Sequence, residues 1–158
     1  QIGAPGGDRI THPGTFNGNP LSAAAGVACL DAVADGSHQE RATATAAGLA
    51  RELNSIFDDE SVAGTVYGQS SMLHIALGME ERPPDGYSWG WQALPSPRPR
   101  VSEAAASALR LGMLNEGVDL MGHGMMVSSV HGAEDVARTV DAFRATLRAM
   151  KAEGAIAG

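Results

Sequence analysis

The segment Thr11–Pro20 holds the residues with the clearest potential for chemistry. It is a glycine-rich loop that runs directly into the start of a helix. Gly14 allows the backbone to come close to a ligand, and Thr15 places a hydroxyl group beside its own backbone N–H. Exposed N–H groups ahead of a helix favour an anion, phosphate above all. The same pattern is typical of simple helix capping, so the loop on its own fits either an anion site or a cap.

Other side-chain patterns with chemical potential point away from metal and hydrolase sites. The five histidines show neither His-x-x-x-His nor His-Glu-x-x-His spacing. They are His12, His38, His74, His123 and His131. No Gly-x-Ser-x-Gly motif supports a serine nucleophile. His12 and His123 fit either contacts to a bound ligand or ordinary hydrogen-bonded loop histidines, and we favour the second interpretation.

The longer string Gly14–Leu21, continued by Ala23–Gly26, carries a family resemblance. It closely resembles the Gly-Thr-x-x-Gly/Ala-Asn-Pro-x-x-x-Ala-Ala-Gly segment of class III pyridoxal-phosphate-dependent aminotransferases, nearest to the glutamate-1-semialdehyde 2,1-aminomutase branch. The resemblance implies that the Gly-Thr pair crosses a homodimer interface and binds the phosphate of the neighbouring subunit's pyridoxal 5'-phosphate. It therefore implies that Gly14 and Thr15 are cofactor-binding residues.

Two later segments resemble the C-terminal portion of the same family. Residues 108–120 are similar to the passage from helix to strand before the last sheet, and residues 125–139 are similar to the segment that leads into the final helix. Their order and spacing after the Gly-Thr segment agree with the family. The resemblance covers most of the chain, and residues 80–100, which are rich in proline and contain both tryptophans, remain unmatched.

The family also needs a lysine that forms a Schiff base with the cofactor, and an aspartate at the pyridine nitrogen. Both lie upstream of the Gly-Thr segment in the family. The only lysine of this sequence is Lys151, which we expect at the solvated end of the last helix. We therefore expect no catalytic residue in this chain, and a missing N-terminal portion or a companion chain that supplies the lysine.

Composition narrows the class of protein further. The chain has 158 residues, of which 44% are hydrophobic and 18% charged, enough to bury a sizeable core. Its formal charge of −7 argues against nucleic-acid binding. No stretch reaches the roughly 20 apolar residues that span a bilayer, so we expect no membrane contact and a cytoplasmic location. The single cysteine, Cys29, excludes an internal disulfide, and its apolar surroundings predict burial.

Hydrophobic spacing and capping residues predict four helices and four short strands. Asn19 and Pro20 open a helix that extends to about Ala34, and Ser37 with Glu40 forms a capping box for a second helix that ends at 58–60. Ser102 caps a third helix, and a fourth covers about 133–152. The expected strands are 62–67, 72–77, 118–121 and 125–129. The second strand is almost continuously apolar, so we expect both of its faces to be covered.

These elements and the resemblance together predict an α/β protein of the pyridoxal-phosphate-dependent transferase fold type I. Residues 1–35 would be the end of its large domain, with apolar surface exposed when alone. Residues 36–158 would be an α+β C-terminal small domain with a short antiparallel sheet and flanking helices.

The complete protein would be a homodimeric aminotransferase that moves an amino group between a small-molecule amino donor and a carbonyl acceptor. Two alternatives stay open. One is an aminomutase that transfers the group within one molecule, and the other is a non-catalytic dimerisation or binding module.

Overall fold

The computed structural model describes residues 14–88 and 102–157 and divides the chain into two compact units, 1–35 and 36–158. His12, Trp89 and Trp91 lie outside the described residues. The elements are the helices α1 (Pro20–Val33), α2 (Ser37–Asp59), α3 (Glu103–Asn115) and α4 (Ala133–Ala152), and the strands β1 (Gly64–Gln69), β2 (Met72–Leu77) and β3 (Gly124–Met126). No described helix has the length and apolar character that crossing a membrane requires.

Helix α1 starts where the sequence predicts. The side chain of Asn19 accepts hydrogen bonds from the N–H groups of Leu21 (2.9 Å) and Ser22 (3.3 Å), and Pro20 occupies the first turn. None of the residues of α1 is buried. The prediction that Cys29 is buried is therefore wrong in the described part of the chain, because apolar neighbours in sequence do not bury a residue whose whole helix is exposed. The prediction of exposed apolar surface in this segment is confirmed by Leu21 and Leu30, whose exposed fractions are 81% and 68%.

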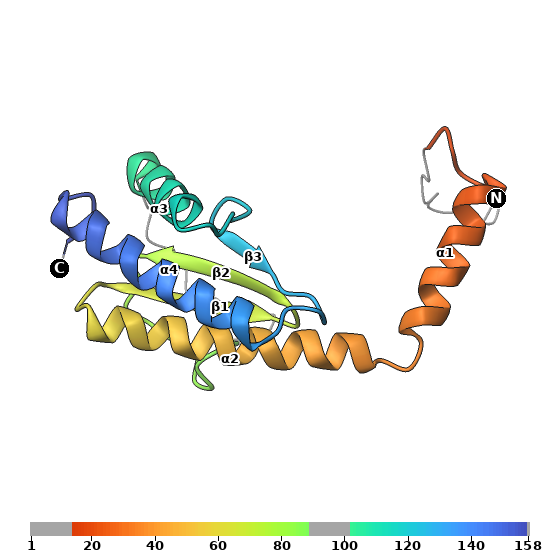
Figure 1. Cartoon of the computed structure of the whole chain (residues 1–158), viewed down its shortest axis with the longest axis horizontal. Helices are drawn as coiled ribbons and strands as arrows, with labels where there is room; N and C mark the ends of the chain where they lie inside the picture. Colours follow the sequence, from red (N-terminus) through yellow and green to blue (C-terminus); the bar gives the residue numbers. More distant parts are fainter. Residues whose placement is uncertain (1–13, 89–101, 158) are drawn as a thin grey trace, which may run out of the picture. The chain divides into compact units, whose positions relative to one another are not determined.

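The other unit is built around a three-stranded antiparallel sheet in the order β1-β2-β3 (Figure 1). Residues Val66 and Ile75 pair across β1 and β2, and Met72 pairs with Met126 across β2 and β3. The strand predicted at 118–121 is wrong: only Met121 forms an isolated bridge, with Gly124, because the chain reverses immediately at Gly122 (φ 65°). The predicted antiparallel sheet with flanking helices is confirmed.

Helices cover one face of this sheet, and α4 lies between α2 and α3 (Figure 1). The predicted buried face of α2 is confirmed, since Ala42, Ala46, Leu49, Leu53 and Ile56 are all buried. Strand β2 alternates: Leu73, Ile75 and Leu77 are buried, whereas Met72 and His74 are exposed. The prediction that both faces of this strand are covered is wrong, because apolar character does not reveal which side the helices occupy.

Close packing in the core joins α2, β1 and α4. The rings of Phe57 and Phe143 meet edge to face, with centroids 5.3 Å apart and planes at 85°. A Cβ atom on Gly64 would lie 2.3 Å from the Phe57 ring, so a side chain at that position would displace the ring. Glycine therefore lets the helix approach the first strand.

Asn54 ties α2 to the open edge of the sheet. Strand β1 has no neighbouring strand on one side, yet the N–H of Val66 donates to Asn54 Oδ1, and Asn54 Nδ2 donates to the carbonyl of Val66, both at 2.8 Å. The same amide donates to the carbonyl of Gly86 at 3.3 Å. The buried side chain thus replaces the missing peptide of a fourth strand and holds the loop that follows β2.

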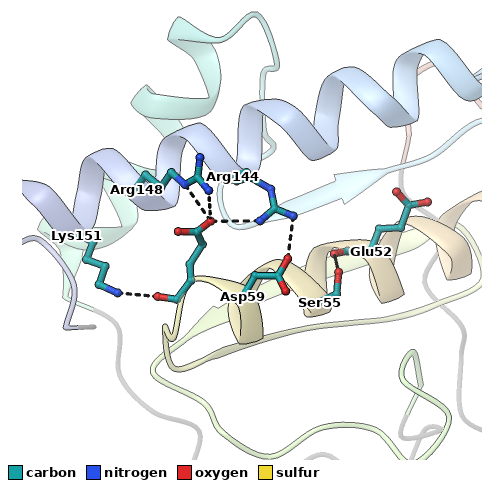
Figure 2. A network of polar contacts seen from close by, with 7 residues as sticks. Glu52, Ser55, Asp59, Arg144, Arg148 and Lys151 are labelled. Carbon is teal, nitrogen blue, oxygen red and sulfur yellow. Dashed lines mark hydrogen bonds and ion pairs between the residues drawn. The ribbon is translucent and has the colours of Figure 1, made fainter.

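A cluster of charged groups joins the end of α2 to the last turns of α4. Figure 2 shows Arg144, Arg148 and Lys151 directed toward this end. Arg144 bonds Asp59 at 2.9 Å and Glu60 at 3.2 Å, and Arg148 bonds Glu60 at 2.9 Å. Lys151 Nζ donates to the carbonyl of Glu60, the residue that caps the C-terminus of α2, at 2.7 Å, so this lysine has a partner although it is exposed. Cations at a helix C-terminus also complement the helix dipole.

Of the predicted caps at Ser37 and Ser102, one is found in the structure and one is not. Ser102 caps α3 as predicted, accepting the N–H of Ala105 at 3.1 Å. The capping box at Ser37 and Glu40 is wrong: the cap residue is Gly36 (φ 76°), and no side chain bonds there. Glycine takes this left-handed conformation without strain, which moves the helix boundary one residue ahead of the expected cap.

We predict that Asn54→Ala destabilises the protein by about 2–4 kcal/mol, because it leaves both the N–H and the carbonyl of buried Val66 without partners. Equilibrium urea unfolding measures this change. Asn115→Ala, at an exposed position at the end of α3, is the control and should change stability by less than about 0.5 kcal/mol. Equal effects of the two substitutions would show that Asn54 does not hold the strand edge.

The cluster at Glu60 predicts a pH dependence of stability. Its hydrogen bond to Arg148 is the main cause that lowers the pKa of the Glu60 carboxyl below 4.5. A lowered pKa in the folded state stabilises the fold above pH 4.5, and this contribution is lost as the pH falls through the folded-state value. From about pH 6 to about pH 3, the Tm of Glu60→Gln should therefore fall less than that of the unchanged protein.

Glu52→Gln, on the same helix but outside the ion-pair cluster, is the matched control for this experiment and should follow the unchanged protein. A parallel loss of Tm in Glu60→Gln and in the unchanged protein would mean that the cluster contributes nothing to stability.

Candidate functional site

The loop Gly14–Asn19 is folded into two consecutive turns. The N–H of Asn17 donates to the carbonyl of Gly14 (3.2 Å), and the N–H of Asn19 donates to the carbonyl of Phe16 (3.0 Å). Gly18 has a φ of 76°, a conformation that suits glycine. A Cβ atom on Gly14 would lie 2.4 Å from Asn17 Oδ1, so a side chain at position 14 would displace the side chain of Asn17. Glycine at position 14 leaves room for that side chain, and glycine at position 18 suits the positive φ of the turn.

This loop presents free hydrogen-bond donors at the start of α1. Within the described residues, the N–H and hydroxyl of Thr15 and the N–H of Phe16 have no partner. Asn19 satisfies the next donors, those of Leu21 and Ser22. The first turn of α1 contains no acidic residue, so no carboxylate there opposes an anion at the positive end of the helix dipole. The geometry therefore suits an anion with several acceptor oxygens, such as a phosphate ester.

The four histidines among the described residues, His38, His74, His123 and His131, all belong to residues 36–158. His38 Nδ1 lies 2.8 Å from Ser129 Oγ and 3.1 Å from Arg41 Nη2, and His131 Nδ1 accepts the N–H of Ser128 at 3.0 Å. His123 is exposed in the turn before β3. Among the described residues, no group of three or more His, Cys, Asp or Glu side chains is arranged to hold a metal ion.

Sequence reasoning missed a cleft of about 640 Å³ in residues 36–158. Its walls come from α2, the turn after α3, β3 and the first half of α4. None of these segments contains a recognisable binding motif. They lie up to about 90 positions apart in the chain, so the sequence pattern does not predict that they meet in a cleft.

Comparisons with known proteins give relatives along almost the whole chain. No protein-family model matches the sequence. Glutamate-1-semialdehyde 2,1-aminomutase of Methanosarcina acetivorans is 31% identical over 143 residues, which are 89% of this chain and 31% of that protein. The chain thus spans about a third of the length of this relative.

Solved structures give the same relationship at the level of the fold. An omega-transaminase from Sphaerobacter thermophilus has a TM-score of 0.66 at 22% identity, covering 88% of this chain and 30% of its own. A transaminase with bound PLP has a TM-score of 0.69 at 22% identity, covering 92% of this chain and 31% of its own. The predicted transferase fold is thereby confirmed. These similarities support the class III pyridoxal-phosphate-dependent aminotransferase family, and the chain is similar to the C-terminal portion of such proteins.

Proposed function

We propose that the complete protein is a pyridoxal-phosphate-dependent aminotransferase that moves an amino group between an amino compound and a carbonyl acceptor. This chain would form the end of its large domain, within residues 1–35, and its C-terminal small domain, residues 36–158. The sequence similarity to an aminomutase and the structural similarity to transaminases support the proposal. Pyridoxal phosphate, when bound, supplies the chemistry by accepting electrons from the carbon that carries the amino group.

The observation that carries the proposal is the set of hydrogen-bond donors in the loop before α1 that have no partner among the described residues. Gly14 and Thr15 would hold the cofactor phosphate, Thr15 through its N–H and its hydroxyl group, with the N–H of Phe16 beside them. Charge-assisted hydrogen bonds of this kind are shorter and stronger than neutral ones. The absence of a carboxylate from the first turn of α1 leaves the helix dipole available to the phosphate. The role of this chain is thus to bind and orient the cofactor.

The lysine that carries the cofactor would come from a missing N-terminal portion or a companion chain. Lys151, the only lysine of this sequence, is bonded to the carbonyl of Glu60 in the small unit. This chain alone would therefore be inactive. We further propose a homodimer with the cofactor site shared between subunits, because Phe16 beside the loop is 75% exposed and α1 buries no residue here. A cytoplasmic location accords with the single free cysteine.

Aminomutation is the second candidate reaction, because the relatives with the higher identity bear the name of an aminomutase. An aminomutase returns the amino group to a neighbouring carbon of the same molecule and releases no keto product. An assay for keto-acid formation with an added amino acceptor separates the two reactions in the complete protein. Net keto acid supports aminotransfer, and turnover without it supports aminomutation.

We predict that Thr15→Ala in the complete protein weakens pyridoxal phosphate binding by about 1.5–3 kcal/mol, roughly tenfold to a hundredfold, because a charge-assisted hydrogen bond is lost. Titration of the cofactor-free protein with pyridoxal phosphate, followed by absorbance, measures the affinity. Thr15→Ser keeps the hydroxyl group and should bind nearly as tightly as the unchanged protein. Equal affinity of Thr15→Ala and the unchanged protein would make the loop a simple helix cap and favour a non-catalytic module.

A further inference from the structure

The cleft in residues 36–158 has one largely apolar wall. It has a volume of about 640 Å³ and lies between α2, β3, the turn after α3 and the first half of α4. Leu49, Met125 and Val136 are among its apolar lining residues. Met125 and Val136 also pack against the core, which fixes this wall to the fold. A small ligand with an apolar part would bury that part against these side chains.

Arg138 of α4 lines the same cleft with a positively charged side chain that has no partner among the described residues. In the described part of the chain its guanidinium forms neither an ion pair nor a hydrogen bond. A Cβ atom built on Gly117 would lie 3.9 Å from Arg138 Nη1, so the guanidinium crosses from α4 to the turn that follows α3. The positive charge therefore lies at the wall of the cleft, where a ligand can reach it.

His131 offers a second donor, and its tautomer follows from its partner. The N–H of Ser128 donates to His131 Nδ1 at 3.0 Å. A backbone N–H cannot accept a hydrogen bond, so Nδ1 must be the acceptor, and the proton of the neutral ring is on Nε2. His131 lines the cleft, and its Nε2–H has no partner among the described residues.

The other charged side chains that line the cleft each form a hydrogen bond or an ion pair within the protein. Arg110 pairs with Asp119 at 3.2 Å and also donates to the carbonyl of Leu120 at 3.1 Å. Asp135 accepts the N–H of Gly132 at 2.8 Å at the positive end of α4. Asp135 keeps its negative charge but faces the N-terminus of α4, so the positive group without a partner in the described residues is Arg138, with the neutral donor of His131 beside it in the lining.

We propose that this cleft binds a monocarboxylate with a short apolar chain. The planar guanidinium of Arg138 matches the two oxygens of a carboxylate, and His131 Nε2–H adds a third donor. The apolar chain lies along Leu49, Met125 and Val136. A phosphate dianion matches the cleft less well, because its second negative charge would also face the Asp135 carboxylate, which lines the cleft. Ligand binding at this cleft does not require the proposed aminotransferase activity.

Hexanoate is the probe for this proposal, with 1-hexanol and hexylamine as comparators of equal chain length. The complete protein, loaded with pyridoxal phosphate and labelled with ¹³C at its methionine methyl groups, is titrated by NMR. We expect saturable shifts of the Met125 signal with hexanoate, about tenfold weaker binding of hexanol, and no binding of hexylamine. Arg138→Met should lower hexanoate affinity about tenfold and leave hexanol affinity unchanged.

Two control variants make the result decisive. Arg51→Met removes an exposed arginine of α2 outside the cleft and should not change hexanoate binding. Thr15→Ala should also leave it unchanged, so a failure of the proposed cofactor role does not affect this test. Equal affinity of hexanoate and hexanol, insensitivity to Arg138→Met, or no saturable shift of the Met125 signal in the millimolar range would each overturn the proposal.

Discussion

The burial of one face of α2 is the constraint on which residues 36–158 depend. The face meets the first strand of the sheet and the last helix at once, through Phe57 and its edge-to-face contact with Phe143. Asn54 on the same helix bonds both backbone groups of Val66, so the open strand edge has no unsatisfied polar atoms at this point. At its C-terminal end the ion pairs of Glu60 hold α4 alongside. One helix thus sets the position of the sheet, the following loop and the last helix.

Helix α1, unlike α2, has no buried face within this chain. It is well capped by Asn19, yet none of its residues is buried in this chain. Its exposed leucines and the free donors of the preceding loop have the same explanation in our proposal: both face parts of the complete protein that this chain does not contain. The chain spans about a third of its relative from Methanosarcina acetivorans, which supports that view. Cofactor binding and the completion of the fold would therefore depend on the same missing partner.

Sequence alone predicted the features that depend on local chemistry. Helix spacing and caps located α1, α3 and α4 almost to the residue, because 3.6-residue periodicity and capping side chains act over a few positions. Features that depend on distant contacts were not accessible. The exposure of Cys29 depends on what its helix packs against, and the alternating burial of β2 depends on which face the helices cover.

The two candidate sites also differ in whether a local sequence motif predicts them. Gly14 and Thr15 were found from a motif that occupies consecutive positions, and their roles remain a proposal. The cleft at Arg138 and His131 has no such motif, because its walls are joined only by the fold.

A crystal structure of the complete protein with pyridoxal phosphate bound tests the central claim most directly. The measurement is the distance from the phosphate oxygens to Thr15 N and Thr15 Oγ1. Our account predicts hydrogen-bond distances of about 2.7–3.0 Å for both contacts. A phosphate held entirely by other residues, with Thr15 beyond hydrogen-bond reach, would contradict it.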